Sequence, residues 1–166
     1  MCKKFELTSE TKIFFGRTLY RIRALIAFGN VESGELGGWV EKEANLSQEG
    51  NAWVYGDAQV SGNACVYGDA RVYGDAWVSG NVWVSGNAWV SKPTHLFQIG
   101  AIGSRDDFTT FVRSETKNIL VACGCFRGTI AEFEAQVKEV HTGTKHEKTY
   151  LAAIELAKLQ MEDVEV

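Results

Sequence analysis

Residues 50–91 read GNAWVY GDAQVS GNACVY GDARVY GDAWVS GNVWVS GNAWVS, a six-residue unit that recurs seven times without a slip. In a strand, residues two apart point the same way, so the Ala and Val of each unit share one face and the variable residue between them lies on the other. Gly followed by Asn or Asp supplies a turn after every short strand. Three such units close one triangular turn of chain. The repeat therefore predicts a coil whose stacked turns form parallel sheets.

The repeat continues upstream with one interruption. Val40 and Leu46 fit the frame six residues apart, but eight residues separate Leu46 from Val54, so two residues are inserted near Gln48 and Glu49. The nine units predict three coils, about the minimum for a self-supporting solenoid. Such a solenoid needs a cap at each end.

Both ends of the chain change pattern. Residues 1–30 predict an N-terminal β cap with strands at 12–15 and 17–28, the second alternating apolar side chains from Tyr20 to Phe28. Residues 92–166 predict a small α+β module with three strands, at 95–102, 108–114 and 118–125. Two helices follow, one starting at a Thr129–Glu132 capping box and one over about 145–161. The expected fold is mainly β, with domains at 1–30, 31–91 and 92–166.

The six-residue frame sorts the outward side chains into three faces. They are Trp39, Gln59 and Trp77; Asn45, Cys65 and Trp83; and Trp53, Arg71 and Trp89. We expect the third face, flanked by Tyr55 and Tyr73, to form an exposed Trp–Arg–Trp stack with cation–π character. Strips of Trp, Tyr and Arg are typical of protein contact surfaces. This face is therefore the predicted interaction or oligomer surface, and a self-stabilising ladder that contacts nothing is the alternative.

The units, such as residues 62–67 and 68–73, resemble the hexapeptide repeats of left-handed parallel β-helices. The resemblance alone implies the left hand, because the general crossover rule favours the right. Residues 34–47, 99–107 and 123–129 extend the resemblance to small hexapeptide-repeat proteins of phages and prophages, which are often classed as transferases from the repeat alone. This second resemblance implies a phage context and the β-helix fold, but no particular reaction.

Charge and cysteine usage restrict the function classes. The net charge is −4, and Lys and Arg are in excess only in residues 1–30, which argues against direct nucleic-acid binding. One residue separates Cys123 from Cys125, whereas zinc sites favour two to four, so we expect packed thiols, no metal and no cofactor. No apolar run of about 18 residues and no signal-peptide core occur, which predicts a cytoplasmic chain without a membrane span.

Three functions remain open. A hexapeptide-type acyltransferase resembles its family in using a His near the coil, but residues 31–91 contain none, and His95 is the first His after them. We therefore predict no catalytic residue and expect a non-enzymatic inhibitor or adaptor that blocks a host protein, such as a defence enzyme, or self-associates as a dimer or trimer. The other alternative is capture of a small anionic, nucleotide-like ligand between subunits by Arg105, Arg113 and Arg127.

Overall fold

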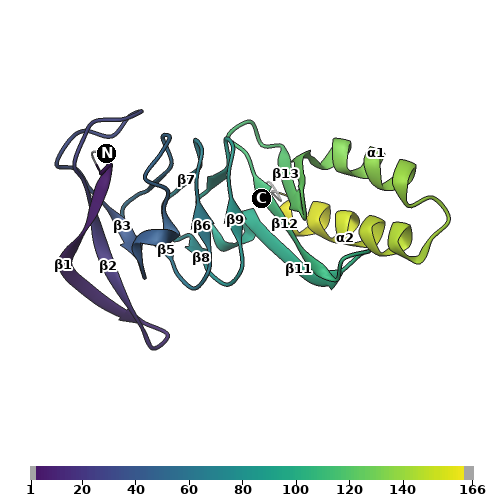
Figure 1. Cartoon of the computed structure of the whole chain (residues 1–166), viewed down its shortest axis with the longest axis horizontal. Coiled ribbons are helices and arrows are strands. Elements are labelled where there is room, and N and C mark those ends of the chain that lie inside the picture. Colours follow the sequence, from purple (N-terminus) through teal and green to yellow (C-terminus); the bar gives the residue numbers. More distant parts are fainter. Residues whose placement is uncertain (1–2, 163–166) are drawn as a thin grey trace. The chain divides into compact units, whose positions relative to one another are not determined.

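The computed structural model describes residues 3–162 and divides the chain into two compact units, 1–93 and 94–166 (Figure 1). Most of the regular structure is β, with two α-helices, α1 (Ile130–Val140) and α2 (Lys145–Met161). None of the helices in the described range is long and apolar enough to cross a membrane.

The first unit contains the repeats as a series of two-residue strands. They are β4 (Trp53–Val54), β5 (Gln59–Val60), β6 (Cys65–Val66), β7 (Arg71–Val72), β8 (Trp77–Val78), β9 (Trp83–Val84) and β10 (Trp89–Val90). Each of the first four of these strands pairs in parallel with the third strand after it, as in β4 with β7 and β7 with β10. The prediction of a β-solenoid-like repeat is confirmed.

Small side chains fill the interior of the repeats. The valine of every unit, from Val54 to Val90, is fully buried, and the alanine or valine two positions earlier is buried as well. Glycine is required at turns such as Gly50, whose φ is +70° and whose added Cβ would lie 2.7 Å from the Gly68 carbonyl oxygen. The six-residue unit thus satisfies the interior and the turn with the same few residue types.

An N-terminal hairpin extends one of the solenoid sheets. Strands β1 (Phe5–Phe14) and β2 (Arg17–Ala24) pair antiparallel, and β2 pairs with β3 (Leu36–Val40), which in turn pairs in parallel with β5. The sheet order is β1-β2-β3-β5-β8. The predicted strand at 17–28 is too long, because β2 ends at Ala24 and Ile26 is partly exposed.

The predicted two-residue insertion has a structural role. Trp39 pairs with Gln59. The sequence separation of this pair is two residues longer than that of the later parallel pairs, such as Trp53 with Arg71. Gln48 lies in the extra length, just after the 3-10 helix η1 (Glu43–Asn45). Its Oε1 accepts hydrogen bonds from the backbone N–H groups of Lys4 (2.8 Å) and Phe5 (3.3 Å). The insertion therefore fixes the start of β1.

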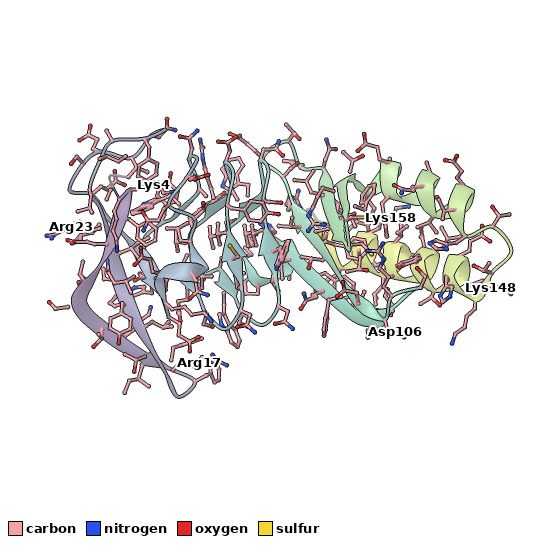
Figure 2. All side chains as sticks on the ribbon, in the orientation of Figure 1. Lys4, Arg17, Arg23, Asp106, Lys148 and Lys158 are labelled. Atoms are coloured by element: carbon pink, nitrogen blue, oxygen red, sulfur yellow. The ribbon has the colours of Figure 1, made fainter. Side chains whose placement is uncertain are left out.

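Lys4 is buried, although it is charged. Lys4 directly precedes β1 (Figure 2). Its Nζ donates to the carbonyl oxygen of Ala52 at 3.0 Å and lies 4.8 Å from the centre of the Phe28 ring. The carbonyl oxygens of Glu49 and Gly50 accept from the same Nζ, each at 3.4 Å. Burial lowers the pKa of Lys4 to about 8, because taking the ammonium out of water disfavours its charged form.

The second unit is a four-stranded antiparallel sheet packed against the two helices. Its strands are β11 (Leu96–Ile102), β12 (Asp107–Arg113), β13 (Ile119–Cys123) and β14 (Phe126–Thr129), in that order, preceded by the 3-10 helix η2 (Pro93–His95). The expectation of three strands is wrong. The chain turns at Gly124, where φ is +54°, and pairs Phe126 with Cys123 as a fourth strand.

The helices follow their sequence signals. Thr129 and Glu132 form the expected capping box at the start of α1, with the Thr129 N–H donating to Glu132 Oε2 at 2.7 Å. Phe133 and Val137 of α1 pack with Tyr150 and Ile154 of α2 against Phe111 of the sheet. This apolar layer is the core of the second unit.

Replacement of Lys4 by Met should change how stability depends on pH. The wild-type free energy of unfolding should rise relative to the K4M variant between about pH 8 and pH 10.5. In this interval the unfolded chain holds the Lys4 proton and the folded chain has released it, so each rise in pH disfavours the unfolded chain. The free energy of unfolding gains at most about 3 kcal/mol over the whole interval. Urea denaturation followed by tryptophan fluorescence, at several pH values in this interval, measures the difference.

The same comparison contains its own control. Other groups that titrate in this range, such as the Cys65 thiol, whose pKa burial raises, are present in both proteins and cancel in the difference. K4M should also be the less stable protein at high pH, since three carbonyl oxygens lose a donor. Parallel pH profiles for the two proteins would contradict the buried position of Lys4.

Candidate functional site

The register stacks the predicted aromatic face as the sequence indicates. Arg71 pairs with Trp53 on one side and with Trp89 on the other. Tyr73 packs against Trp89, with 5.5 Å between ring centres. Arg71, Tyr73, Trp89 and Tyr55 are all half-buried. Among residues 3–162, no cation–π contact joins Arg71 to the two tryptophan rings; Lys12 and Arg21 make such contacts with Trp39.

The prediction that Trp53 belongs to the exposed surface is wrong. Its side chain is 0% exposed, so it cannot present its ring to a partner. Phe5 and Phe28 cover it with edge-to-face contacts, at 6.1 and 5.3 Å between ring centres. Both belong to the N-terminal segment, which lies over the first position of this ladder. Trp53 is a core residue, and only the later members of the face reach solvent.

The most exposed aromatic cluster in the first unit lies elsewhere, at the tip of the β1–β2 hairpin. We call Phe14, Phe15 and Trp77 the hairpin patch. Phe15 is 75% exposed and its ring stacks on that of Trp77 at 5.0 Å, with 13° between the ring planes. Trp77 is itself 40% exposed. The patch joins the hairpin to the face that carries Trp39 and Gln59.

The hairpin turn holds Phe15 in an unfavourable backbone conformation. Phe14 pairs with Arg17, so the loop is two residues long, and φ is +46° at Phe15 and +75° at Gly16. Two positive φ angles in a two-residue loop are the pattern of a type I′ turn, which strongly prefers Asn-Gly. A bulky residue in this region costs of order 1–3 kcal/mol. The sequence places Phe at a position where Asn would fold more easily.

Polar atoms in the sheet that includes the hairpin are also incompletely satisfied. Arg21 Nε, Trp39 Nε1 and Gln59 Oε1 are buried and have no hydrogen-bond partner within residues 3–162. The three residues lie side by side on β2, β3 and β5. Each such atom costs about 1–3 kcal/mol. The unfavourable turn and the unpaired polar atoms therefore occur in the same sheet.

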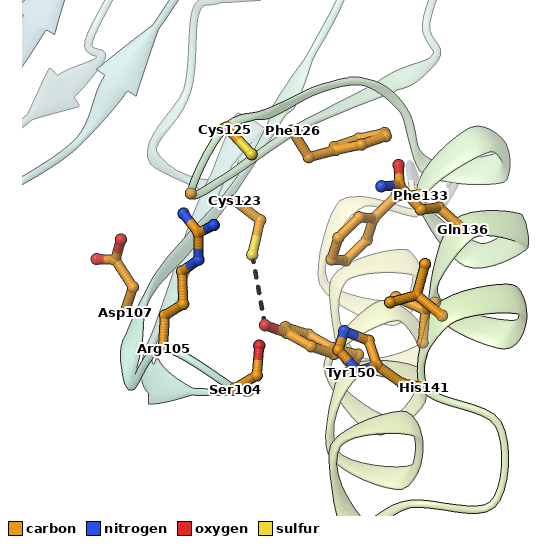
Figure 3. Close-up of a pocket in the computed structure, with 13 residues that line it drawn as sticks. Ser104, Arg105, Asp107, Cys123, Cys125, Phe126, Phe133, Gln136, His141 and Tyr150 are labelled. Carbon is orange, nitrogen blue, oxygen red and sulfur yellow. Dashed lines mark hydrogen bonds between the residues drawn. The ribbon is translucent and has the colours of Figure 1, made fainter.

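The second unit contains a pocket of about 210 Å³ (Figure 3). The β11–β12 turn contributes Ser104 and Arg105, and the β13–β14 turn contributes Cys125. Helix α1 contributes Phe133 and Gln136. Val137 and Val140 of α1 add to the apolar part of the wall, while Gln136 and His141, the residue that caps the end of α1, are polar groups on the same side.

The three arginines that were predicted from the sequence to bind an anion do not share one site. Arg105 lines the pocket. Arg113 is nearly buried and its Nη1 donates to the Met161 carbonyl oxygen at 3.2 Å. Arg127 Nη1 donates to the carbonyl oxygens of Gly124 (2.7 Å) and Phe126 (2.6 Å). Arg113 and Arg127 therefore hold backbone segments in place, and Arg105 is the one of the three at the pocket.

Sequence reasoning missed several residues of these sites. Tyr150 reaches the pocket from α2. The Cys123 thiol donates to the Tyr150 hydroxyl at 3.8 Å, and its sulfur accepts from Thr109 Oγ1 at 3.2 Å. Gly103 leaves the space that the Tyr150 hydroxyl fills, since an added Cβ would lie 1.7 Å from that oxygen. Within residues 3–162, no group of three His, Cys, Asp or Glu side chains could hold a metal ion.

Comparison with known proteins bears on the repeat. A family model described as the YdcK beta solenoid repeat matches residues 58–74 and 66–80. These overlapping segments contain β5, β6, β7 and β8. The comparison with curated proteins gives no match. The chain therefore contains a β-solenoid-like repeat, and the match does not extend to the tip of the hairpin or to the pocket.

The different positions of the tryptophans predict different effects on stability. Replacement of Trp53 by Ala should lower the free energy of unfolding by about 3–5 kcal/mol, because it empties a fully buried site. The matched change Trp83→Ala, at a residue that is 49% exposed, should cost less than about 1 kcal/mol. Urea denaturation of the two variants checks this. Equal midpoints would show that Trp53 is not a core residue.

Proposed function

We propose that this chain is a non-enzymatic binding protein that contacts another protein through the hairpin patch. The observation that carries the proposal is Phe15, which is exposed and held at a φ of +46° where Asn would be favoured. Unfavourable local conformations that the rest of a fold supports are characteristic of functional sites. A residue kept for folding alone would have no reason to occupy this position.

The geometry of the patch suits protein recognition. The rings of Phe15 and Trp77 are stacked, and Phe14 meets Trp77 edge-to-face at 5.2 Å between ring centres. Rings that are already ordered lose little conformational freedom when a partner binds. Lys12 and Arg21 lie over Trp39 in the sheet that carries Trp77, and Asp57 interacts with Lys12, which gives the apolar centre a charged margin. Aromatic anchors with a polar rim are the usual composition of a binding hot spot.

The finer architecture belongs to the same proposal. We infer a left-handed parallel β-helix of about three coils built from hexapeptide units, which would be a rigid support for the hairpin. The parallel pairing of each unit with the third unit after it supports this inference, and the left hand rests on the resemblance to hexapeptide-repeat proteins. The half-buried remainder of the predicted interaction face, Arg71 and Trp89 with their two tyrosines, would flank the contact surface or serve self-association.

The biological setting follows from the resemblance to phage and prophage proteins. In that setting the chain would act in the host cytoplasm, as an inhibitor or adaptor that occupies a host protein such as a defence enzyme. A second copy of the chain, in a dimer or trimer, is the other partner that the exposed aromatics would fit. The two partners are distinguished by the experiment below.

The Phe15→Asn substitution tests the proposal directly. It should raise the free energy of unfolding by about 1 kcal/mol, because Asn-Gly suits the turn. It should also weaken partner binding by more than about tenfold, because a hot-spot ring is lost. Chemical denaturation measures the first effect. Retention of lysate proteins on immobilised chain, followed by titration of the purified partner, measures the second.

A matched pair of tryptophan variants completes the design. Trp77→Ala should weaken binding as Phe15→Asn does, whereas Trp83→Ala removes a comparably exposed ring on another face and should leave binding unchanged. Sedimentation velocity of the same proteins detects a second copy as the partner, since the wild type would then sediment as an oligomer and F15N as a monomer. The proposal fails if F15N and W77A bind and assemble as the wild type does.

A further inference from the structure

We propose that the pocket of the second unit binds a small monocarboxylate with an aromatic or branched apolar body. This inference is independent of the protein contact proposed above, because it uses residues of the other unit. The pocket is bounded by the β11–β12 turn, the β13–β14 turn, α1 and Tyr150 of α2 (Figure 3). Its volume of about 210 Å³ equals the liquid volume of about seven water molecules. A single ring with a short chain fits this space.

Arg105 provides the positive charge for the carboxylate. Its side chain lines the pocket and makes no hydrogen bond or ion pair within residues 3–162. The other two candidate arginines, by contrast, donate to backbone carbonyl oxygens. A guanidinium presents paired N–H groups that match a carboxylate in a bidentate arrangement. Ser104 also lines the pocket, and its side chain is hydrogen-bonded to Tyr150 (Figure 3). Arg105 is therefore the group that would bind the carboxylate.

The surrounding charges favour a single negative charge on the ligand. Asp107 also lines the pocket, and its Oδ1 accepts from the Phe108 N–H at 2.7 Å. A dianion such as a phosphate monoester would be repelled by this carboxylate, with only one guanidinium to offset the repulsion. Burial raises the pKa of Tyr150 to about 12, so its hydroxyl stays neutral. The pocket is therefore suited to a monoanion.

The apolar wall selects the body of the ligand. Phe126 and Phe133 approach with 5.0 Å between ring centres, and Val137 and Val140 continue the apolar surface along α1. Phe133 and Val137 are buried in the core of the unit and hold the wall in position. An aromatic ring or a branched alkyl group would bury its surface here, whereas a short polar acid would gain nothing from these contacts.

Phenylacetate is the probe for the test, with the full chain observed by two-dimensional NMR. Titration should shift the resonances of the pocket residues and give a saturable affinity. Replacement of Arg105 by Gln should weaken this affinity by about tenfold or more. The matched control Lys148→Gln removes the same charge from an exposed residue of the same unit that does not line the pocket. It should leave the affinity unchanged.

A second variant tests the pocket by blocking it, and two further probes test the charge of the ligand. Gln136→Trp places a large ring at the mouth of the pocket from an exposed position on α1, and should abolish binding without unfolding the unit. 2-Phenylethanol, which has the same ring without the charge, should bind about tenfold more weakly. Phenyl phosphate should also bind more weakly than phenylacetate. No shifts with phenylacetate, equal affinity in R105Q, or tighter binding of phenyl phosphate would overturn the proposal.

Discussion

The backbone hydrogen bonds between successive turns of the repeat are the constraint on which the first unit depends. The N–H of Trp53 donates to the Ala70 carbonyl oxygen at 3.1 Å, and that of Tyr55 to the Val72 carbonyl oxygen at 2.7 Å. The same pattern joins Gln59 to Ala76 and Ser61 to Val78. Strands of two residues have almost no stability alone. Each one is ordered only because the strand one turn away satisfies its polar groups and covers its valine.

This constraint determines which outward side chains can act on other molecules. A ladder here is the set of outward side chains that stack at one position of successive turns. The N-terminal segment covers the first side chain of one ladder and leaves the last side chain of another partly exposed. Trp53 is buried under Phe5 and Phe28, while Trp77 stays partly exposed beside the hairpin tip. Two tryptophans that each lie in an Ala-Trp-Val segment therefore have opposite roles. Position within the ladder decides exposure.

The same reasoning explains what the sequence could and could not predict. The period of six predicts the short strands, the buried valines and the pairing of Trp53 with Arg71, because these depend on neighbouring units. Burial of Trp53 and Lys4 depends on contacts with residues far away in the sequence, and nothing in the local pattern marks them. The pocket could be predicted only as far as Arg105, since Tyr150 joins it through the packing of α2.

Stacked residues lie three repeat units apart in the sequence, and this spacing limits how a chain of this kind can change in length over evolution. Adding or deleting one whole turn of three units leaves every outward side chain on its own ladder. A change of a single unit, although it preserves the sequence pattern, transfers all later side chains to the neighbouring ladder and removes Trp77 from beneath Phe15. Relatives that keep the hairpin contact should therefore differ by whole turns. Insertions of other lengths should be confined to places such as Gln48–Glu49, where the extra chain has acquired contacts of its own.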